Sequence, residues 1–89
     1  KDEVLQTEEL AAELIRFLAA NYPGVLENKY TITAAPDPYV MLGRIAESRH
    51  CLVRGNELDT EKAAMLLMDD FREGKLGRLT LEYPQTEEA

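Results

Sequence analysis

The sequence predicts a small all-α domain with three main helices, one short helix and an extended C-terminal tail. Apolar residues recur at helical spacing in three stretches, and capping residues, proline or glycine bound each stretch. No stretch alternates apolar and polar residues for long enough to predict a sheet. A chain of 89 residues is one small domain. We therefore expect residues 1–84 to form a single helical domain, and residues 85–89 to be a disordered tail.

The first main helix is expected over residues 8–21. Thr7 is the predicted N-cap, and the glutamates that follow it suit the positive end of a helix. Pro23 and Gly24 end the helix. One short helical turn is expected over residues 25–30, followed by a loop over residues 31–33. The expected core face of the first helix consists of Leu10, Ala11, Leu14, Ile15, Phe17, Leu18 and Tyr22.

The second main helix is expected from Pro38 to about Arg49. Asp37 is its predicted N-cap, and proline at the first helical position loses no hydrogen bond. Gly43 predicts close packing at the middle of this helix. Residues 51–53 are expected to be a buried connector and residues 54–56 a turn. The inward stripe is expected to consist of Tyr39, Leu42, Ile45 and Ala46.

The third main helix is expected to begin after Asp59, its predicted N-cap, and to end at Gly74, which can take the left-handed conformation. Asp69 and Asp70 are expected to belong to its solvated face. Residues 79–83 are expected to form one strand or an extended tail. The expected core face consists of Ala63, Ala64, Leu67, Met68 and Phe71, with Leu66 at its edge and Met65 outside it.

The charge distribution narrows the possible partners. The net charge of −7 argues against general nucleic-acid binding, and we expect no DNA partner. Residues 1–43 carry 3 basic and 7 acidic side chains, residues 44–78 carry 7 of each, and residues 79–89 carry 3 acidic ones. A local basic surface is therefore expected in the later part of the chain. The single cysteine, Cys51, favours a reducing cytoplasm, and no apolar run is long enough for a membrane span.

The sequence contains no recognisable catalytic or metal-binding constellation. Gly74 and Lys75 resemble the end of a phosphate-binding loop, but Leu76 stands where serine or threonine is required, and the motif follows a helix. His50 and Cys51 are chain neighbours with no third residue to orient the imidazole, so a structural cysteine is expected. Residues 28–31 resemble a guanine-recognition motif, but threonine replaces the acid that reads the base.

Three segments resemble a known family when taken in order. They are LAAELIRFLAANYPGVLENKY, PDPYVMLGRIAESRHCLVRGNELD and FREGKLGRLTLEYP. Together they are similar to the C-terminal region of the YlqF/RbgA-type circularly permuted ribosome-assembly GTPases. The resemblance implies a parent GTPase that acts late in large-ribosomal-subunit assembly and binds GTP and Mg²⁺ outside this chain. It also implies that this domain contacts ribosomal RNA or the large-subunit precursor and is not itself an enzyme.

Basic residues are the expected RNA contacts, because they displace counterions from phosphates and arginine also stacks on bases. Arg54 and Arg78 lie outside the expected helices and lead the candidates. Arg49 and His50 accompany Arg54 around the first loop, and Arg72 and Lys75 accompany Arg78 around the second. Helix capping is a competing explanation for these four residues. The alternative function is a protein-interaction or regulatory module that packs on the parent's own GTPase domain through Met65 and Leu66, without direct RNA contact.

Overall fold

A computed structural model describes residues 2–77 of the chain. The elements follow the order α1 (Asp2–Asn21), α2 (Val25–Tyr30), α3 (Pro38–Ser48), β1 (Leu52–Val53), a 3-10 turn (Arg54–Asn56), β2 (Glu57–Leu58) and α4 (Thr60–Arg72). The three main helices and the short one confirm the all-α prediction. The predicted extended segment at 79–83 and the predicted tail at 85–89 lie outside the described residues. Within the described residues, no helix is both long and apolar enough to cross a membrane.

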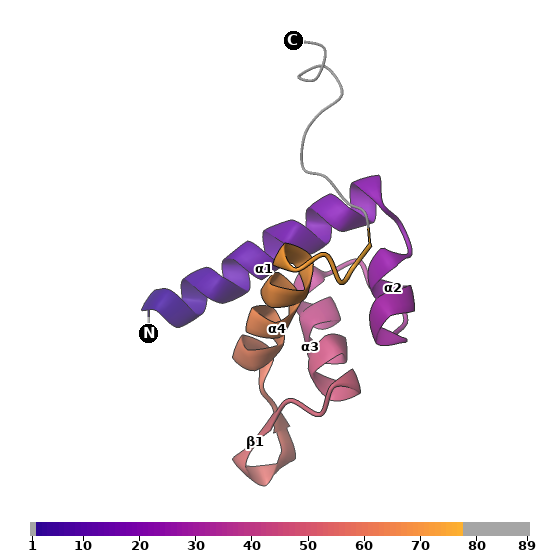
Figure 1. The fold of residues 1–89 in the computed structure, drawn as a ribbon. Coiled ribbons are helices and arrows are strands. Elements are labelled where there is room, and N and C mark those ends of the chain that lie inside the picture. Colours follow the sequence, from indigo (N-terminus) through magenta and orange to yellow (C-terminus); the bar gives the residue numbers. More distant parts are fainter. Residues whose placement is uncertain (1, 78–89) are drawn as a thin grey trace.

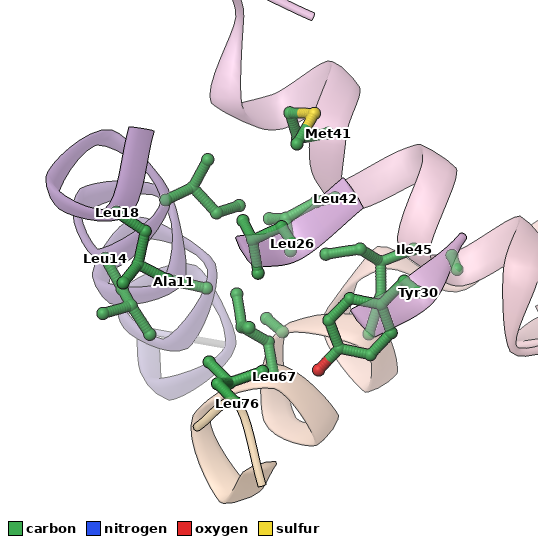
Figure 2. Packing of buried hydrophobic residues seen from close by; sticks show 14 of the residues in the cluster. Ala11, Leu14, Leu18, Leu26, Tyr30, Met41, Leu42, Ile45, Leu67 and Leu76 are labelled. Atoms are coloured by element: carbon green, nitrogen blue, oxygen red, sulfur yellow. The ribbon is translucent and has the colours of Figure 1, made fainter. Parts of the chain in front are cut away.

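The helices α3 and α4 lie side by side and run in opposite directions, and α1 crosses one end of this pair (Figure 1). The β1–β2 hairpin connects α3 to α4 and projects from the other end (Figure 1). The short helix α2 lies beside α3. Figure 2 shows that side chains from all four helices meet in one core, which Leu76, just beyond α4, also joins. The hairpin therefore projects away from this core (Figure 1).

Side-chain caps fix the beginnings of α3 and α4. The Asp37 carboxylate accepts a hydrogen bond from the backbone N–H of Tyr39 at 2.9 Å. Asp59 does the same for the N–H of Lys62 at 3.0 Å. Each carboxylate satisfies a donor that has no partner inside the helix. Both predicted N-caps are confirmed.

The ends of α3 and α4 share one geometry. The N–H of Cys51 bonds to the carbonyl of Ala46 at 2.8 Å, and the N–H of Lys75 bonds to the carbonyl of Asp70 at 2.8 Å. This six-residue closure is the Schellman motif, which requires a left-handed residue just before the donor. Gly74 fills that position after α4 with φ 76°, as predicted. After α3 the position belongs to His50, with φ 58°.

The start of the first helix and three burial predictions were wrong. The helix α1 begins at Asp2, so Thr7 lies inside it, because the preceding residues include good helix formers. Leu10 is exposed because it lies beside, not within, the arc of α1 that α3 and α4 cover. Tyr39 is also exposed, and Met41 takes the inward position in α3. Asp70 is buried instead of solvated, because a partner in α2 accompanies it.

Two predictions about the α3–α4 connection were also wrong. Leu52 and Val53 are exposed strand residues, and in the segment predicted as a buried connector only Cys51 is buried. A Cβ on Gly43 would meet nothing nearer than Leu58 Cδ1 at 3.7 Å, so this glycine is not required by close packing. The predicted turn at residues 54–56 is confirmed.

Candidate functional site

The hairpin between α3 and α4 is built from very short strands. Leu52 pairs with Leu58 and Val53 pairs with Glu57 in antiparallel register. The backbone N–H of Asp59 donates to the carbonyl of Cys51 at 2.7 Å and closes the base of the hairpin. Because cross-strand neighbours share a face, Leu52 and Leu58 lie together on one side of it. The leucines and Val53 are exposed, so the hairpin presents apolar surface to solvent.

Arg54 lies in the turn of this hairpin. Gly55, with φ 81°, and Asn56, with φ 63°, reverse the chain through left-handed conformations. Glycine and asparagine tolerate this backbone region better than other residues. The Arg54 side chain is exposed and makes no hydrogen bond or ion pair with any residue from 2 to 77. The turn thus carries a cation that is free to bind a partner.

Arg49 and His50 lie near the base of the hairpin, at the end of α3. The Arg49 guanidinium donates to the carbonyl of Lys29 at 3.1 Å and lies 5.0 Å from the centre of the Tyr30 ring. Arg49 therefore caps the end of α2, not its own helix, and it also makes a cation–π contact. The hydroxyl of Ser48 donates to the carbonyl of Tyr30 at 2.8 Å and completes this cap. His50 is exposed in its left-handed position.

Arg72 and Lys75 lie at the opposite end of α4 from Arg54. A helix of 13 residues separates the two groups by about 20 Å. Arg72 pairs with Asp69, and the Lys75 ammonium lies 3.2 Å from the Glu73 carboxylate. The hydrogen bond and charge of Glu73 raise the pKa of Lys75. Both pairs are exposed, so a competing anion can break them at little cost.

The predicted site residues therefore do not form one patch. The structure groups Arg49, His50 and Arg54 at the hairpin end and places Arg72 and Lys75 at the other end of α4. Arg78 lies outside the described residues.

A buried polar pair joins α2 to the C-terminal part of α4. The Tyr30 hydroxyl donates to Asp70 Oδ2 at 2.7 Å, and both residues are buried. Burial and the bond to Asp70 raise the pKa of Tyr30 well above its ordinary value. This contact holds α2, and with it the cap made by Arg49, against the rest of the domain. No local sequence pattern predicts this contact, because 40 residues separate the two partners.

The two predicted docking residues differ in accessibility. Met65 is exposed on the side of α4 opposite the core. Leu66 is partly buried and packs against the core. They therefore do not form a joint surface, and Met65 is the accessible one.

The described residues do not fit a GTP or Mg²⁺ site. Leu76, which follows the Gly74–Lys75 pair, is buried in the core, and the pair lies at the C-terminal end of a helix, where the dipole disfavours phosphate. Lys29, from the motif-like run at 28–31, lies inside α2. Cys51 is buried, as a structural cysteine should be. Between residues 2 and 77, no three potential metal ligands gather.

Sequence comparison finds known proteins that are similar to this chain. The chain is 34% identical over 86 residues to "Ribosome biogenesis GTPase A" of Bacillus cereus, a match that covers 96% of this chain and 29% of that protein. It is 33% identical over 89 residues to the protein of the same name from Priestia megaterium, covering 99% and 31%. Over almost its whole length, the chain is therefore similar to one part of the ribosome biogenesis GTPase A proteins. No family model matches the chain.

The chain spans less than a third of the length of the curated relatives it matches. The ribosome biogenesis GTPase A protein from Bacillus pumilus has the same relation, with 32% identity over 87 residues and 31% of its length covered. The resemblance inferred from the three sequence segments is thus confirmed. The residues described above form a helical module that corresponds to one part of these relatives.

Proposed function

We propose that this chain is the RNA- and ribosome-contacting C-terminal module of a cytoplasmic GTPase that acts late in large-ribosomal-subunit assembly. The relatives are named as ribosome biogenesis GTPases, which supports the setting. The parent would bind GTP and Mg²⁺ outside the described residues, and this module would carry no catalytic group. Its partners would be ribosomal RNA in the large-subunit precursor and the parent's own GTPase domain.

The position of Arg54 carries the proposal. The hairpin projects from the helices (Figure 1), and the Arg54 side chain in its turn is exposed and has no partner among residues 2–77. An arginine so placed can grip a phosphate with two parallel hydrogen bonds or stack on an unpaired base. The exposed apolar side chain of Val53, next to Arg54 in the chain, adds contact surface for a base.

The other basic residues are weaker candidates for RNA contact than Arg54. His50 is exposed near the hairpin base and can add a second contact. Arg49 already caps α2, so an RNA contact would compete with a structural role. Arg72 and Lys75 would need to exchange a carboxylate for a phosphate, and they would bind a separate part of the RNA.

Sedimentation of the chain with large-subunit precursor particles across a salt series tests the proposal. We expect binding to weaken steeply with salt, because phosphate contacts release counterions. Arg54→Ala should lower the affinity and reduce the salt slope by about one unit. Arg54→Lys should recover only part of the affinity, because lysine neither stacks nor forms the two-pronged contact.

Arg16→Ala is the matched control. It removes the same charge from an exposed position on α1, where the guanidinium pairs with Glu13 at 2.8 Å. If Arg16→Ala and Arg54→Ala weaken particle binding equally, the hairpin has no special role and the proposal fails.

The alternative function is a regulatory module that packs on the parent's GTPase domain. The exposure of Met65 on the outward side of α4 favours it. In that case Met65→Ala in the full parent protein should change GTP turnover, while Arg54→Ala leaves particle binding unchanged. The opposite pattern favours RNA contact.

A further inference from the structure

A strip of exposed apolar surface extends from α1 along α3 to the hairpin. We call it the apolar strip, and it consists of Leu10, Tyr39, Gly43, Leu58 and Leu52. Its four side chains are between 44% and 59% exposed. Single exposed apolar residues are common on protein surfaces, but a continuous run of them marks an interaction site.

The continuity of the strip follows from its contacts. Leu10 and Tyr39 line one open depression of about 550 Å³ between α1 and α3. Gly43 lies one helical turn after Tyr39 on the same face of α3. Leu58 Cδ1 lies 3.7 Å from the position of a Cβ on Gly43, and Leu52 is the cross-strand neighbour of Leu58. The strip thus joins α1, α3 and the hairpin.

Gly43 forms a shallow depression in the middle of the strip, because it has no side chain. Glycine is a poor helix former, yet it occupies the middle of α3 with an ordinary negative φ. Neither the backbone nor close packing requires it, because a Cβ would meet only one side-chain atom, at an ordinary contact distance. The missing side chain leaves the surface of α3 open beside Leu58.

The charges beside the strip are acidic. Glu9 and Glu13 line the depression, and Glu47 lies one turn beyond the glycine on α3. Glu13 is neutralised by Arg16, whereas Glu9 and Glu47 have no ion pair with any residue from 2 to 77. The guanidinium of Arg44 donates instead to two carbonyl oxygens of the loop before α3. Carboxylates flanking apolar surface attract an amphipathic ligand with basic edges.

We propose that the apolar strip docks a basic amphipathic protein segment, with apolar side chains over Gly43 and lysine or arginine beside Glu9 and Glu47. Helix-in-groove recognition uses this combination. RNA is disfavoured because its phosphates would meet unpaired carboxylates. A second copy of the chain is disfavoured because each carries a net charge of −7. Residues 79–89 are disfavoured because they contain 3 acidic residues and no basic one.

This docking does not depend on the RNA contact proposed for Arg54, which lies in the hairpin turn outside the strip. A protein segment that itself binds RNA would carry the required basic residues. The module would then bind an assembling particle through two chemically different surfaces. One surface would hold nucleic acid and the other a basic protein chain.

Fluorescence anisotropy with a designed peptide tests the proposal. The probe is a labelled helix of about four turns, with leucines at i, i+4 and i+7 and lysines on both flanks. Gly43→Lys fills the floor of the strip and adds a like charge, so we expect about tenfold weaker binding or more. Lysine is a better helix former than glycine, so the melting temperature should not fall. A loss of binding would therefore not reflect unfolding.

Met65→Lys is the matched control, because it adds the same charge at an exposed apolar residue on the far side of α4. It should change peptide binding by less than about twofold. Equal losses in both variants would mean unspecific attraction between acid and base and would overturn the proposal. Equal binding of a peptide with glutamates in place of its lysines would also overturn it.

The same variants distinguish a nucleic-acid ligand. Gly43→Lys should leave binding of a single-stranded RNA oligonucleotide unchanged or strengthen it, since it adds a positive charge. If Tyr39→Ala and Gly43→Lys instead weaken RNA binding and spare peptide binding, the strip is an RNA surface and the proposal is wrong.

Discussion

Replacing Tyr30 with phenylalanine tests the contact that joins α2 to α4. The substitution keeps the buried ring and removes the hydroxyl that donates to Asp70 at 2.7 Å. Asp70 is 8% exposed, so water can replace this donor only in part. A hydrogen bond to a charged group contributes about 1.5–3 kcal/mol, and we expect a loss of about 2 kcal/mol in the free energy of unfolding. In a domain of this size, that corresponds to a fall of about 10 °C in the melting temperature.

The pH dependence gives a second, independent signature. Because the pKa of Tyr30 is raised in the folded state, its contribution is complete below the ordinary tyrosine pKa of 10.0 and is lost as the pH rises above that value. The phenylalanine variant has no such group. The difference in unfolding free energy between the two proteins should therefore shrink when the pH is raised beyond about 10.

Urea unfolding followed by circular dichroism at several pH values measures both effects. Tyr39→Phe is the control, because this tyrosine is exposed and should show neither change. A loss smaller than about 0.5 kcal/mol for Tyr30→Phe at neutral pH would mean that Asp70 is solvated, and the argument would be refuted.

Three further stability changes follow from the same structure, and thermal unfolding measures each. Asp59→Ala removes the N-cap of α4 and should lower the free energy of unfolding by about 1 kcal/mol. Asp59→Ser keeps a side-chain acceptor at this position and should retain most of the stability. His50→Gly relieves the strain of a left-handed backbone conformation at the end of α3 and should raise the free energy of unfolding by up to about 1 kcal/mol. Destabilisation would argue that the imidazole has a structural partner. Leu67→Ala should cost about 2–5 kcal/mol because Leu67 is fully buried, whereas Leu10→Ala should stay within about 0.5 kcal/mol. Equal costs for the two substitutions would contradict the burial of Leu67 and the exposure of Leu10.

The helices could be predicted because their signals are local. Asp37 followed by Pro38, and Asp59 with the apolar spacing after it, identify helix starts from neighbouring residues alone. Gly74 identified a helix end in the same way. These signals depend on hydrogen bonds within a few residues, so tertiary packing does not alter them.

Burial was harder to predict because it depends on neighbours from elsewhere in the chain. Leu10 and Tyr39 continue the apolar stripes of their helices, but the stripes are wider than the arcs that the other helices cover. Asp70 looks like a surface residue until Tyr30 is brought against it. The hairpin strands have two residues each, which is too short for an alternating pattern.

The candidate residues were predicted by residue type and by the loop that they flank, whereas the contacts that they make within the domain were not predicted. The exposed turn position of Arg54 followed from the glycine and asparagine beside it. That Arg49 caps another helix depends on Lys29, 20 residues away, and no local pattern indicates it.

The closed base of the hairpin has a consequence for how such a module can diverge. The hydrogen bond between the Asp59 N–H and the Cys51 carbonyl joins the residues that precede and follow the hairpin. Residues 52–58 beyond it are all exposed, so changes in their length or composition leave the helices undisturbed. Selection can therefore change what the hairpin recognises while the bundle is inherited intact. Exchanging this segment between relatives is thus the most direct way to transfer a binding preference from one member to another.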